Sequence, residues 1–207
     1  MRHLPRLALL IQTVIAAGTF IVANDVTQEL GPLQVGWLRI LLSFVFVLPF
    51  YLMTLRRRRI PDRADMGRLA LLGLTGITAN QMLFLFGIQL SPPLNGALFY
   101  AFTPVMVLVI AVMLLGERLT VFKTVGVGAA VVGVLLVLYA NGLDLSAGPG
   151  RGDVLLLLAV SAWAGYTVMG KPLLEKYDAL TVTVWAFGFG ALSMLPATPW
   201  VFQDLDL

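Results

Sequence analysis

The chain has 207 residues, of which 59% are apolar and 12% are charged, and its formal net charge is +3. Soluble globular domains average roughly 45–50% apolar and about 25% charged residues, so this composition excludes an ordinary soluble domain and a disordered chain. The chain has no cysteine and a single histidine, His3. We therefore expect no catalytic residue, no metal site and no cofactor, and we expect that the protein is not an enzyme.

Seven apolar stretches follow one another along the chain, and each has about the 20 residues that a membrane-spanning helix needs. They predict an all-α integral membrane protein with about seven transmembrane helices, packed as one bundle in the lipid bilayer. The expected spans are residues 6–24, 32–53, 67–89, 95–115, 121–140, 152–171 and 180–203.

The distribution of the 14 basic residues predicts the orientation. With the N-terminus in the cytoplasm, only Arg151 lies outside and Arg39 lies within a span. Cytoplasmic loops of membrane proteins carry an excess of basic residues, so we expect a multi-pass protein of the plasma (inner) membrane, with its N-terminus cytoplasmic and the C-terminus of this chain external. The cytoplasmic residues are then Arg2, Arg6, Arg56, Arg57, Arg58, Arg59, Arg63, Arg68, Arg118, Lys123, Lys171 and Lys176.

The arginine run at 56–59 has an alternative interpretation as a nucleic-acid patch. Stop-transfer charge and attraction to anionic lipids already explain such a run beside a membrane span. We therefore expect no nucleic-acid partner, and the sequence leaves self-association open.

An internal repeat relates the two ends of the chain at an offset of 147 residues. Ala17-Gly18 matches Ala164-Gly165, and Leu48-Pro49 matches Leu195-Pro196. Five spans per copy is an odd number, so the second copy enters the membrane inverted. Inverted repeats are typical of secondary transporters, whose substrate sites lie near the midplane where the repeats meet.

The repeat also predicts the domain organisation. A first repeat of five spans occupies residues 1–141, an external linker occupies 142–151, and a partial second repeat of two spans occupies 152–207. Two full copies need 294 residues, twice the offset, and the chain has 207. We expect a C-terminally truncated or partial form of a ten-span protein, and a genuine seven-span protein is the alternative.

Several short stretches, in this order and spacing, resemble the EamA-like family of the drug/metabolite transporter superfamily. The resemblance covers the first repeat and the opening of the second, and it implies an exporter or importer of amino acids, metabolites or drugs. One departure is Asn24, where many relatives have a lysine. The matching stretches are Gly18-Thr19-Phe20, Pro32 before Arg39, Thr103-Pro104, Gly116-Glu117-Arg118-Leu119, the glycine-rich fifth span, Gly152-Asp153, and Ser161-Ala162-Trp163-Ala164 with Tyr166.

Arg39 is the main candidate for substrate binding. It lies about seven residues into the second span, roughly 10 Å along the helix, where a charge costs about 2.5 kcal/mol or more if it is central and unpaired. One interpretation is a guanidinium that holds a carboxylate substrate. The other is an arginine that reaches the interface and pairs with Asp25 or Glu29.

Polar and aromatic residues near the middle of other spans are further candidates. The third span carries Thr75, Thr78, Asn80 and Gln81, and two of these, three residues apart, share a side of a helix. Pro104 predicts a kink in the fourth span. Each candidate has a structural alternative: helix-to-helix hydrogen bonding, aromatic packing or a plain bend. The predicted substrate-binding residues are Arg39, Asn24, Thr78, Gln81, Tyr100, Thr103, Trp163 and Tyr166, with Pro104 as the kink.

The glycine-rich fifth span has two pairs of small residues spaced four apart, Gly126 with Ala130 and Ala129 with Gly133. This spacing predicts close packing against another helix.

Together these features predict a secondary transporter or exporter of small metabolites, amino acids and related compounds among them, that works by alternating access. The alternative is a non-transporting membrane scaffold or an inactive truncated remnant. An intramembrane enzyme would need a carboxylate pair, a metal cluster or a nucleophile with its base, and the predicted spans contain none.

Overall fold

The computed structural model describes residues 18–19, 22–55, 58–116, 120–140 and 150–203, and every regular element within them is helical. Residues 22–30 are helical. The helices that follow are α2 (Pro32–Thr54), α3 (Arg63–Leu72), the π-helix η2 (Gly73–Ala79), α4 (Asn80–Gln89), α5 (Pro93–Ala101), α6 (Thr103–Leu115), α7 (Val121–Ala140), α8 (Arg151–Lys176), α9 (Ala179–Met194), the 3₁₀-helix η4 (Leu195–Ala197) and α10 (Thr198–Gln203).

The predicted fold class, an all-α integral membrane protein, is confirmed. Five helical stretches in the described residues are long and apolar enough to cross a membrane, and within α7 the stretch Val121–Gly133 is apolar but shorter. Most of the predicted first span, 6–24, lies outside the described residues. The five long stretches are Pro32–Thr54, Arg63–Gln89, Leu94–Leu115, Arg151–Lys176 and Ala179–Gln203.

Local sequence signals set several helix ends. Pro32 and Pro93 occupy the first turns of α2 and α5, where the missing N–H of proline costs nothing. Gly116 ends α6 in the left-handed region, with φ of 62°, which glycine adopts without strain. Asp178 caps α9 by accepting from the Thr181 N–H at 3.1 Å.

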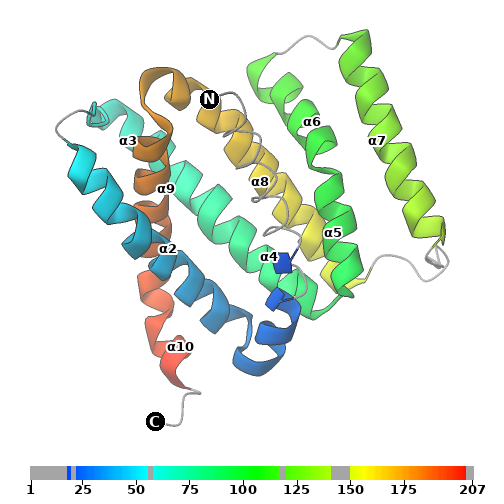
Figure 1. Ribbon diagram of the computed structural model, residues 1–207, viewed down its shortest axis with the longest axis horizontal. Helices are drawn as coiled ribbons and strands as arrows, with labels where there is room; N and C mark the ends of the chain where they lie inside the picture. The colour runs from blue at the N-terminus through cyan, green and yellow to red at the C-terminus, as the bar shows by residue number, and fades with distance from the viewer. Residues whose placement is uncertain (1–17, 20–21, 56–57, 117–119, 141–149, 204–207) are drawn as a thin grey trace, which may run out of the picture.

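The continuous stretch of α3, η2 and α4 runs through the middle of the bundle (Figure 1). α8 packs against α4 and α6, whereas α9 packs against α2 and η2. The helices α8 and α9 meet at the turn between them and diverge, one along each side of the central stretch (Figure 1). Two helices of the predicted second repeat therefore enclose the third span of the first.

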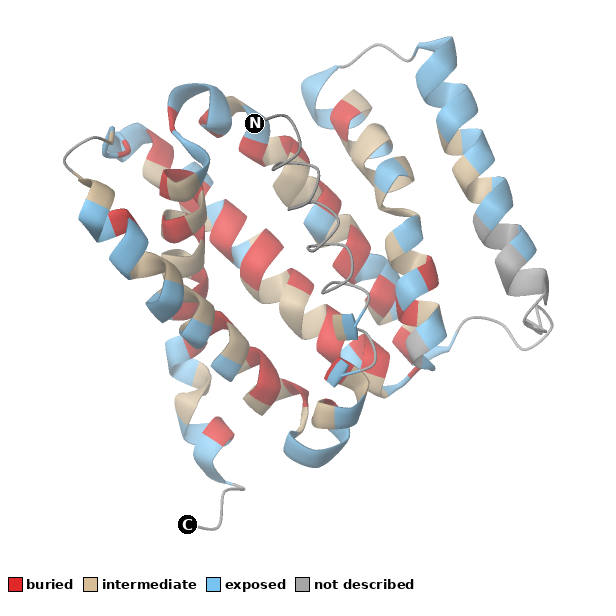
Figure 2. Ribbon diagram, in the orientation of Figure 1, coloured by how far each residue is buried: buried red, intermediate tan, exposed pale blue. Residues whose placement is uncertain are grey.

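Most of the buried side chains lie along this central stretch and the two helices beside it (Figure 2). One apolar cluster joins Leu69 and Leu72 of α3 to Leu173 of α8 and Ala186 of α9. A second cluster joins Leu85 and Ile88 of α4 to Leu156 and Ala159 of α8. Apolar contact thus holds the two predicted repeats together at both ends of the third span.

Close backbone approach holds η2 against α9. A methyl group on Gly73 would lie 2.6 Å from the Ala186 carbonyl oxygen, and one on Gly190 would lie 2.7 Å from a side-chain carbon of Ile77. Only glycine permits this spacing. The segment in between is a π-helix, a form that occurs mostly as short insertions and often at functional sites.

The prediction of close packing for the fifth span is wrong for the described residues. The helix α7 lies at the edge of the bundle and is mostly exposed (Figure 2). No heavy atom of another described helix lies within 4 Å of a methyl group built on Gly126, Gly128 or Gly133. A small-residue face permits close packing but does not supply the helix that would use it.

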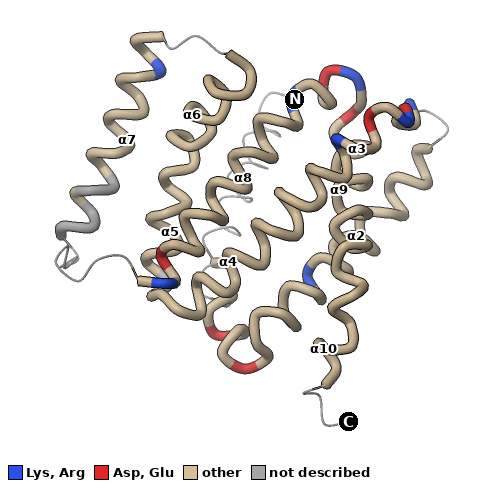
Figure 3. Tube along the Cα trace, turned by 180° about the vertical axis from the view of Figure 1, so that it is seen from behind, with Lys and Arg blue, Asp and Glu red and all other residues tan. Residues whose placement is uncertain are grey.

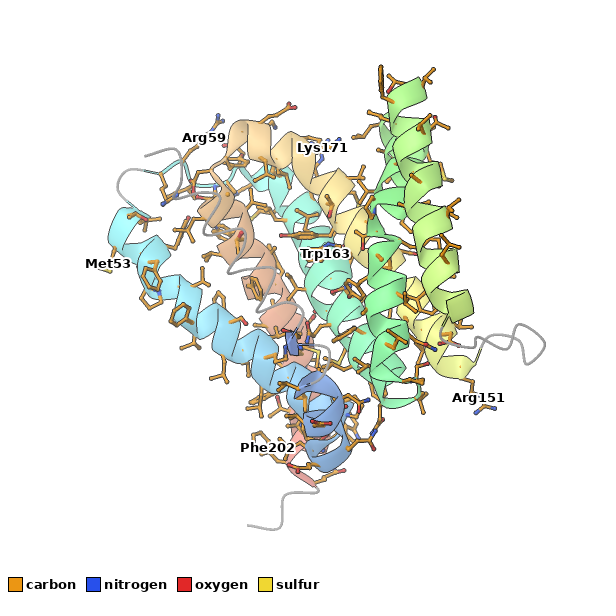
Figure 4. The ribbon with its side chains drawn as sticks, turned by 45° about the vertical axis from the view of Figure 1, so that its right-hand side comes forward. Met53, Arg59, Arg151, Trp163, Lys171 and Phe202 are labelled. Carbon is orange, nitrogen blue, oxygen red and sulfur yellow. The ribbon has the colours of Figure 1, made fainter. Side chains whose placement is uncertain are left out.

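Charged residues gather at the ends of the helices (Figure 3). Arg59 and Lys171 lie at one end of the bundle, and Arg151 lies at the other (Figure 4). This separation agrees with the predicted sidedness, while the assignment of either end to the cytoplasm stays a prediction. We call the end that carries Arg58 and Arg59 the arginine-rich end.

Candidate functional site

A cavity of about 130 Å³ lies between helices of the two predicted repeats. Trp163, which lines it, lies midway between the two ends of the bundle (Figure 4). The cavity therefore occupies the depth and the repeat boundary where transporter folds bind substrate. Its lining residues are Arg39, Ile40 and Ser43 of α2, Gly76 and Ile77 of η2, Asn80 and Gln81 of α4, Trp163 of α8 and Phe187 of α9.

Arg39 and Gln81 form the polar wall of the cavity. With the Gln81 amide oriented so that its oxygen faces the guanidinium, that oxygen accepts from both Nε and Nη1 of Arg39, each at 3.0 Å. The opposite orientation would set amide hydrogens against guanidinium hydrogens, so the network selects this one. The contact fixes the direction of the guanidinium without neutralising its charge.

Within the described chain, Arg39 forms no ion pair with a carboxylate. The ion pairs with Asp25 or Glu29 that the alternative interpretation requires are not formed, and both of these side chains are exposed. Arg39 itself is half-buried. A positive charge within a membrane span needs an anion or a wet cavity, and the Arg39 side chain lines a cavity.

Asn80 joins three helices beside this wall. Its Nδ2 donates to the Tyr100 hydroxyl and to the Ala159 carbonyl oxygen, both at 2.8 Å. The Tyr100 ring packs edge-on against Phe84, with ring centroids 5.5 Å apart. Tyr100, a predicted binding residue, thus lies behind Asn80 and is not part of the cavity lining.

Trp163 and Tyr166 form the aromatic wall. Their rings are stacked, with centroids 5.2 Å apart and an interplanar angle of 23°. Of these two aromatic residues, only Trp163 lines the cavity. The Tyr166 ring lies directly against Gly76, in the space that a side chain at position 76 would fill. Tyr166 therefore sets the position of Trp163 and of the π-helix.

The other predicted residues lie away from the cavity. The Thr78 hydroxyl is 2.7 Å from that of Ser193 and 3.3 Å from the Gly190 carbonyl oxygen, so it joins η2 to α9. Asn24 donates to the Ile88 carbonyl oxygen at 2.8 Å. Both side chains join helices in the structure, and a role for them in binding substrate stays a prediction.

The fourth span is interrupted at Phe102, and α6 begins at Thr103 with Pro104 in its first turn. Pro104 has no N–H to donate to the Tyr100 carbonyl oxygen. The Thr103 hydroxyl donates to that oxygen instead, at 2.5 Å. Thr103 and Pro104 together form the interruption, and neither lines the cavity.

Six lining residues were not among the predicted binding residues: Ile40, Ser43, Gly76, Ile77, Asn80 and Phe187. Ser43 follows Arg39 by four residues and so shares its helix face, which the spacing alone indicates. Asn80 belongs to the polar group seen in the third span. The sequence carries no signal that would place Gly76 against an aromatic ring.

A polar network joins the repeats at the arginine-rich end. Tyr177 lies in the turn between α8 and α9, and its hydroxyl shares its single hydrogen between Asp65 Oδ2 at 2.9 Å and Asp62 Oδ2 at 3.2 Å. Lys176 pairs with Asp65 at 3.1 Å, and Arg58 pairs with Asp178. We call this set the polar joint: Arg58, Asp62, Asp65, Lys176, Tyr177 and Asp178.

A second, larger cavity of about 300 Å³ lies between α2 and α9. Phe44, Leu48 and Phe189 are among the side chains that line it, and no charged residue does. Its polar groups are the Tyr51 hydroxyl and the Trp185 indole nitrogen, which bond to each other at 3.2 Å. This cavity offers little to a polar solute, so the smaller one is the better candidate.

Comparison with known proteins gives matches to transporters. The model of the EamA-like transporter family matches residues 4–139 and 150–206. An uncharacterized transporter of Archaeoglobus fulgidus is 28% identical over 191 residues, which cover 92% of this chain and 65% of that protein. A probable terminal-alkyne amino-acid exporter of Streptantibioticus cattleyicolor is 31% identical over 141 residues, which cover 68% of this chain and 46% of that protein.

The uncharacterized transporter YyaM of Bacillus subtilis is 26% identical over 138 residues, which cover 66% of this chain and 45% of that protein. The match to this chain thus extends over about half to two thirds of the length of these relatives. No solved structure matches the chain.

Proposed function

The chain belongs to the EamA-like transporter family, and from that membership we propose that it is part of a secondary transporter for small carboxylate-bearing metabolites, amino acids among them. Transport proceeds by alternating access. The cavity between the two predicted repeats is the substrate site, and Arg39 holds the carboxylate. The resemblance seen in the sequence is confirmed at the level of the family.

The observation that carries this proposal is the state of Arg39. Guanidinium has five N–H donors in a fixed plane, and Gln81 takes up one at Nε and one at Nη1. One hydrogen on Nη1 and two on Nη2 remain, so one from each nitrogen can form the fork that carboxylates accept in pairs. A bound carboxylate would supply the negative charge that no described side chain provides.

Two further observations support the proposal. The cavity is smaller than the roughly 300–1,000 Å³ of pockets for drug-sized ligands, which favours a small solute or the polar head of a larger one. The Streptantibioticus relative is named as a probable exporter of an amino acid, which is a carboxylate. Transporter names among the relatives also fit a protein that catalyses no covalent step.

The test is substrate exchange by the protein in lipid vesicles, with a labelled amino-acid mixture, for three arginine variants. Arg39→Gln removes the charge, and Arg39→Lys keeps the charge but loses the planar fork. Arg63→Gln, a matched control, changes an exposed arginine at the arginine-rich end. Loss of two charge-assisted hydrogen bonds, each worth about 1.5–3 kcal/mol, predicts a fall of roughly 100-fold or more for Arg39→Gln.

Arg39→Lys is expected to retain partial activity, and Arg63→Gln should resemble the unaltered protein. Membrane insertion and yield of each variant are measured beside the flux. Full exchange activity in a correctly inserted Arg39→Gln variant would show that Arg39 does not hold the substrate.

A further inference from the structure

Asn80 presents a carbonyl oxygen that the protein itself does not use. Its Nδ2 bonds to the Ala159 carbonyl oxygen, which only accepts hydrogen bonds, so this atom is the nitrogen of the amide. The second hydrogen on Nδ2 bonds to the Tyr100 hydroxyl. Both amide hydrogens are therefore committed, and they hold the side chain in one orientation.

The remaining atom, Oδ1, reaches the cavity. Asn80 is only 7% exposed, and its oxygen accepts from no group in the described chain. No fully buried side-chain nitrogen or oxygen of the described residues lacks a partner. The Asn80 oxygen is therefore not fully buried, and the space that Asn80 borders is the Arg39 cavity.

We propose that Asn80 determines substrate specificity by accepting a hydrogen bond from an N–H group of the substrate, beside the carboxylate held by Arg39. This inference rests on the proposed function of Arg39. The two side chains present opposite polarity to one small cavity: a cationic donor from α2 and a neutral acceptor from α4. A solute with an ammonium group next to a carboxylate satisfies both.

The amide side chain of Asn80 is suited to accepting a hydrogen bond from the substrate beside Arg39. A carboxylate at position 80 would also accept from an ammonium group, but it would compete with the substrate for the Arg39 guanidinium. An amide oxygen accepts without carrying a charge. The two anchoring bonds of Asn80 fix the oxygen before the substrate arrives, so little ordering cost remains for binding.

A purely structural role predicts a different behaviour. If Asn80 served only to join α4 to α5 and α8, its two donated bonds would account for it, and its loss would weaken the binding of every solute alike. A role in specificity predicts that binding weakens for solutes with the N–H group and not for matched solutes without it. The ratio of two affinities separates these cases.

The experiment measures binding by calorimetry for three matched pairs of probes: alanine with propionate, leucine with 4-methylpentanoate, and phenylalanine with 3-phenylpropionate. The protein is compared with Asn80→Leu, which keeps the size and removes the oxygen. Asn80→Ser keeps a polar group for the helix contacts, but its shorter side chain moves the acceptor oxygen away from the cavity. This variant is used if the leucine variant does not insert. Asn95→Leu is the control, because Asn95 bonds to Asp153 outside the cavity.

The expected result is that, for at least one pair, the unaltered protein binds the amino acid about 10–100-fold more tightly than its partner, and that an Asn80 variant brings this ratio close to one. Affinity for the plain carboxylate should stay within about threefold, and Asn95→Leu should preserve the ratio. Equal weakening of both members by the Asn80 variants would overturn the inference while leaving the Arg39 proposal standing. Binding of neither member by the unaltered protein, or binding insensitive to Arg39→Gln, would overturn the Arg39 proposal and this inference together.

Discussion

The Tyr177 hydroxyl, in the turn between α8 and α9, donates to Oδ2 of Asp65 in the first turn of α3 at a distance of 2.9 Å. The Asp65 side chain is only 4% accessible and pairs with Lys176 as well. This contact ties the turn where α8 and α9 meet to the start of the central span. Since the two helices diverge from that turn on either side of the central stretch of α3, η2 and α4 (Figure 1), the polar joint fixes their relative position at this end.

Replacing Tyr177 by phenylalanine should lower the thermal stability of the protein in detergent. The change keeps the ring, which lies under the Arg59 guanidinium at 5.5 Å, and removes only the hydroxyl. The Asp65 carboxylate then loses one of its hydrogen-bond donors while remaining buried. A buried carboxylate with fewer donors lowers the free energy of unfolding. Glu175→Gln is the control, because it alters a carboxylate exposed on the last turn of α8. Equal melting temperatures for the two variants would contradict this account of the joint.

The joint should also weaken at alkaline pH. The Asp62 backbone N–H donates to the Tyr177 hydroxyl and by itself lowers the pKa of the phenol. Burial and the bonds from the hydroxyl to the Asp65 and Asp62 carboxylates outweigh it, so the pKa lies above its ordinary value of about 10. A raised pKa means that the contribution to stability is complete below about pH 10 and is lost as the pH rises through the folded-state value.

Unfolding of the unaltered protein and of Tyr177→Phe, compared from about pH 8 to about pH 11, checks this. The stability difference between the two should be constant up to about pH 10 and should shrink above it. A difference that grows with pH would give the phenol the opposite role.

Gly76→Ala should disturb the aromatic wall. The added methyl group would overlap the Tyr166 ring, and this ring is stacked on Trp163. Such overpacking costs about 1–3 kcal/mol, and we also expect weaker substrate binding because Trp163 must move. Gly126→Ala is the matched control, since its methyl group meets no other described helix and alanine favours a helix by about 1 kcal/mol. Equal stability of the two variants would show that the ring does not depend on Gly76.

Thr103→Val should destabilise the fourth span. It removes the hydroxyl that donates to the Tyr100 carbonyl oxygen, to which Pro104 has no N–H to donate. Hydrogen bonds inside membranes contribute about 0.6 kcal/mol on average and at most about 1.7 kcal/mol, and we expect a loss near the upper value. Thr167→Val is the control, because the Trp163 carbonyl oxygen, which Thr167 also bonds, lies inside the continuous helix α8. Equal losses would mean that the interruption needs no hydroxyl.

The membrane spans could be predicted because their signal is the length of an apolar run, which depends on no partner. The burial of Asp65 could not be predicted from the sequence. The sequence places it in the loop before residue 67, whereas α3 begins at Arg63 and carries Asp65 into contact with a turn 111 residues away. Such a contact depends on how two distant segments pack, and hydropathy does not report it.

Which polar side chains face the same cavity could be predicted only in part, because this also depends on local helix geometry that hydropathy does not report. Thr78 and Gln81 are three residues apart, and a regular helix would place them on one side. The π-helix ends at Ala79, between them, and its wider turns change the direction in which later side chains point. As a result, Thr78 contacts Ser193 of α9 while Gln81 contacts Arg39 of α2.

Accessibility of position 43 to a thiol reagent tests whether the substrate site lies between the two predicted repeats. Ser43 lines the Arg39 cavity, and the chain has no cysteine, so a Ser43→Cys variant carries a single reactive thiol. Phe46→Cys is the matched control, because Phe46 is 70% exposed on the outer surface of the same helix. A membrane-impermeant maleimide is applied in turn to each side of oriented vesicles.

A substrate site between the repeats that opens to each side in turn would let the thiol at position 43 react from both sides of the membrane. A bound amino acid should slow the reaction, while the thiol at position 46 should stay unreactive. A thiol at position 43 that reacts from neither side, or that amino acids do not protect, would contradict a substrate site between the two repeats.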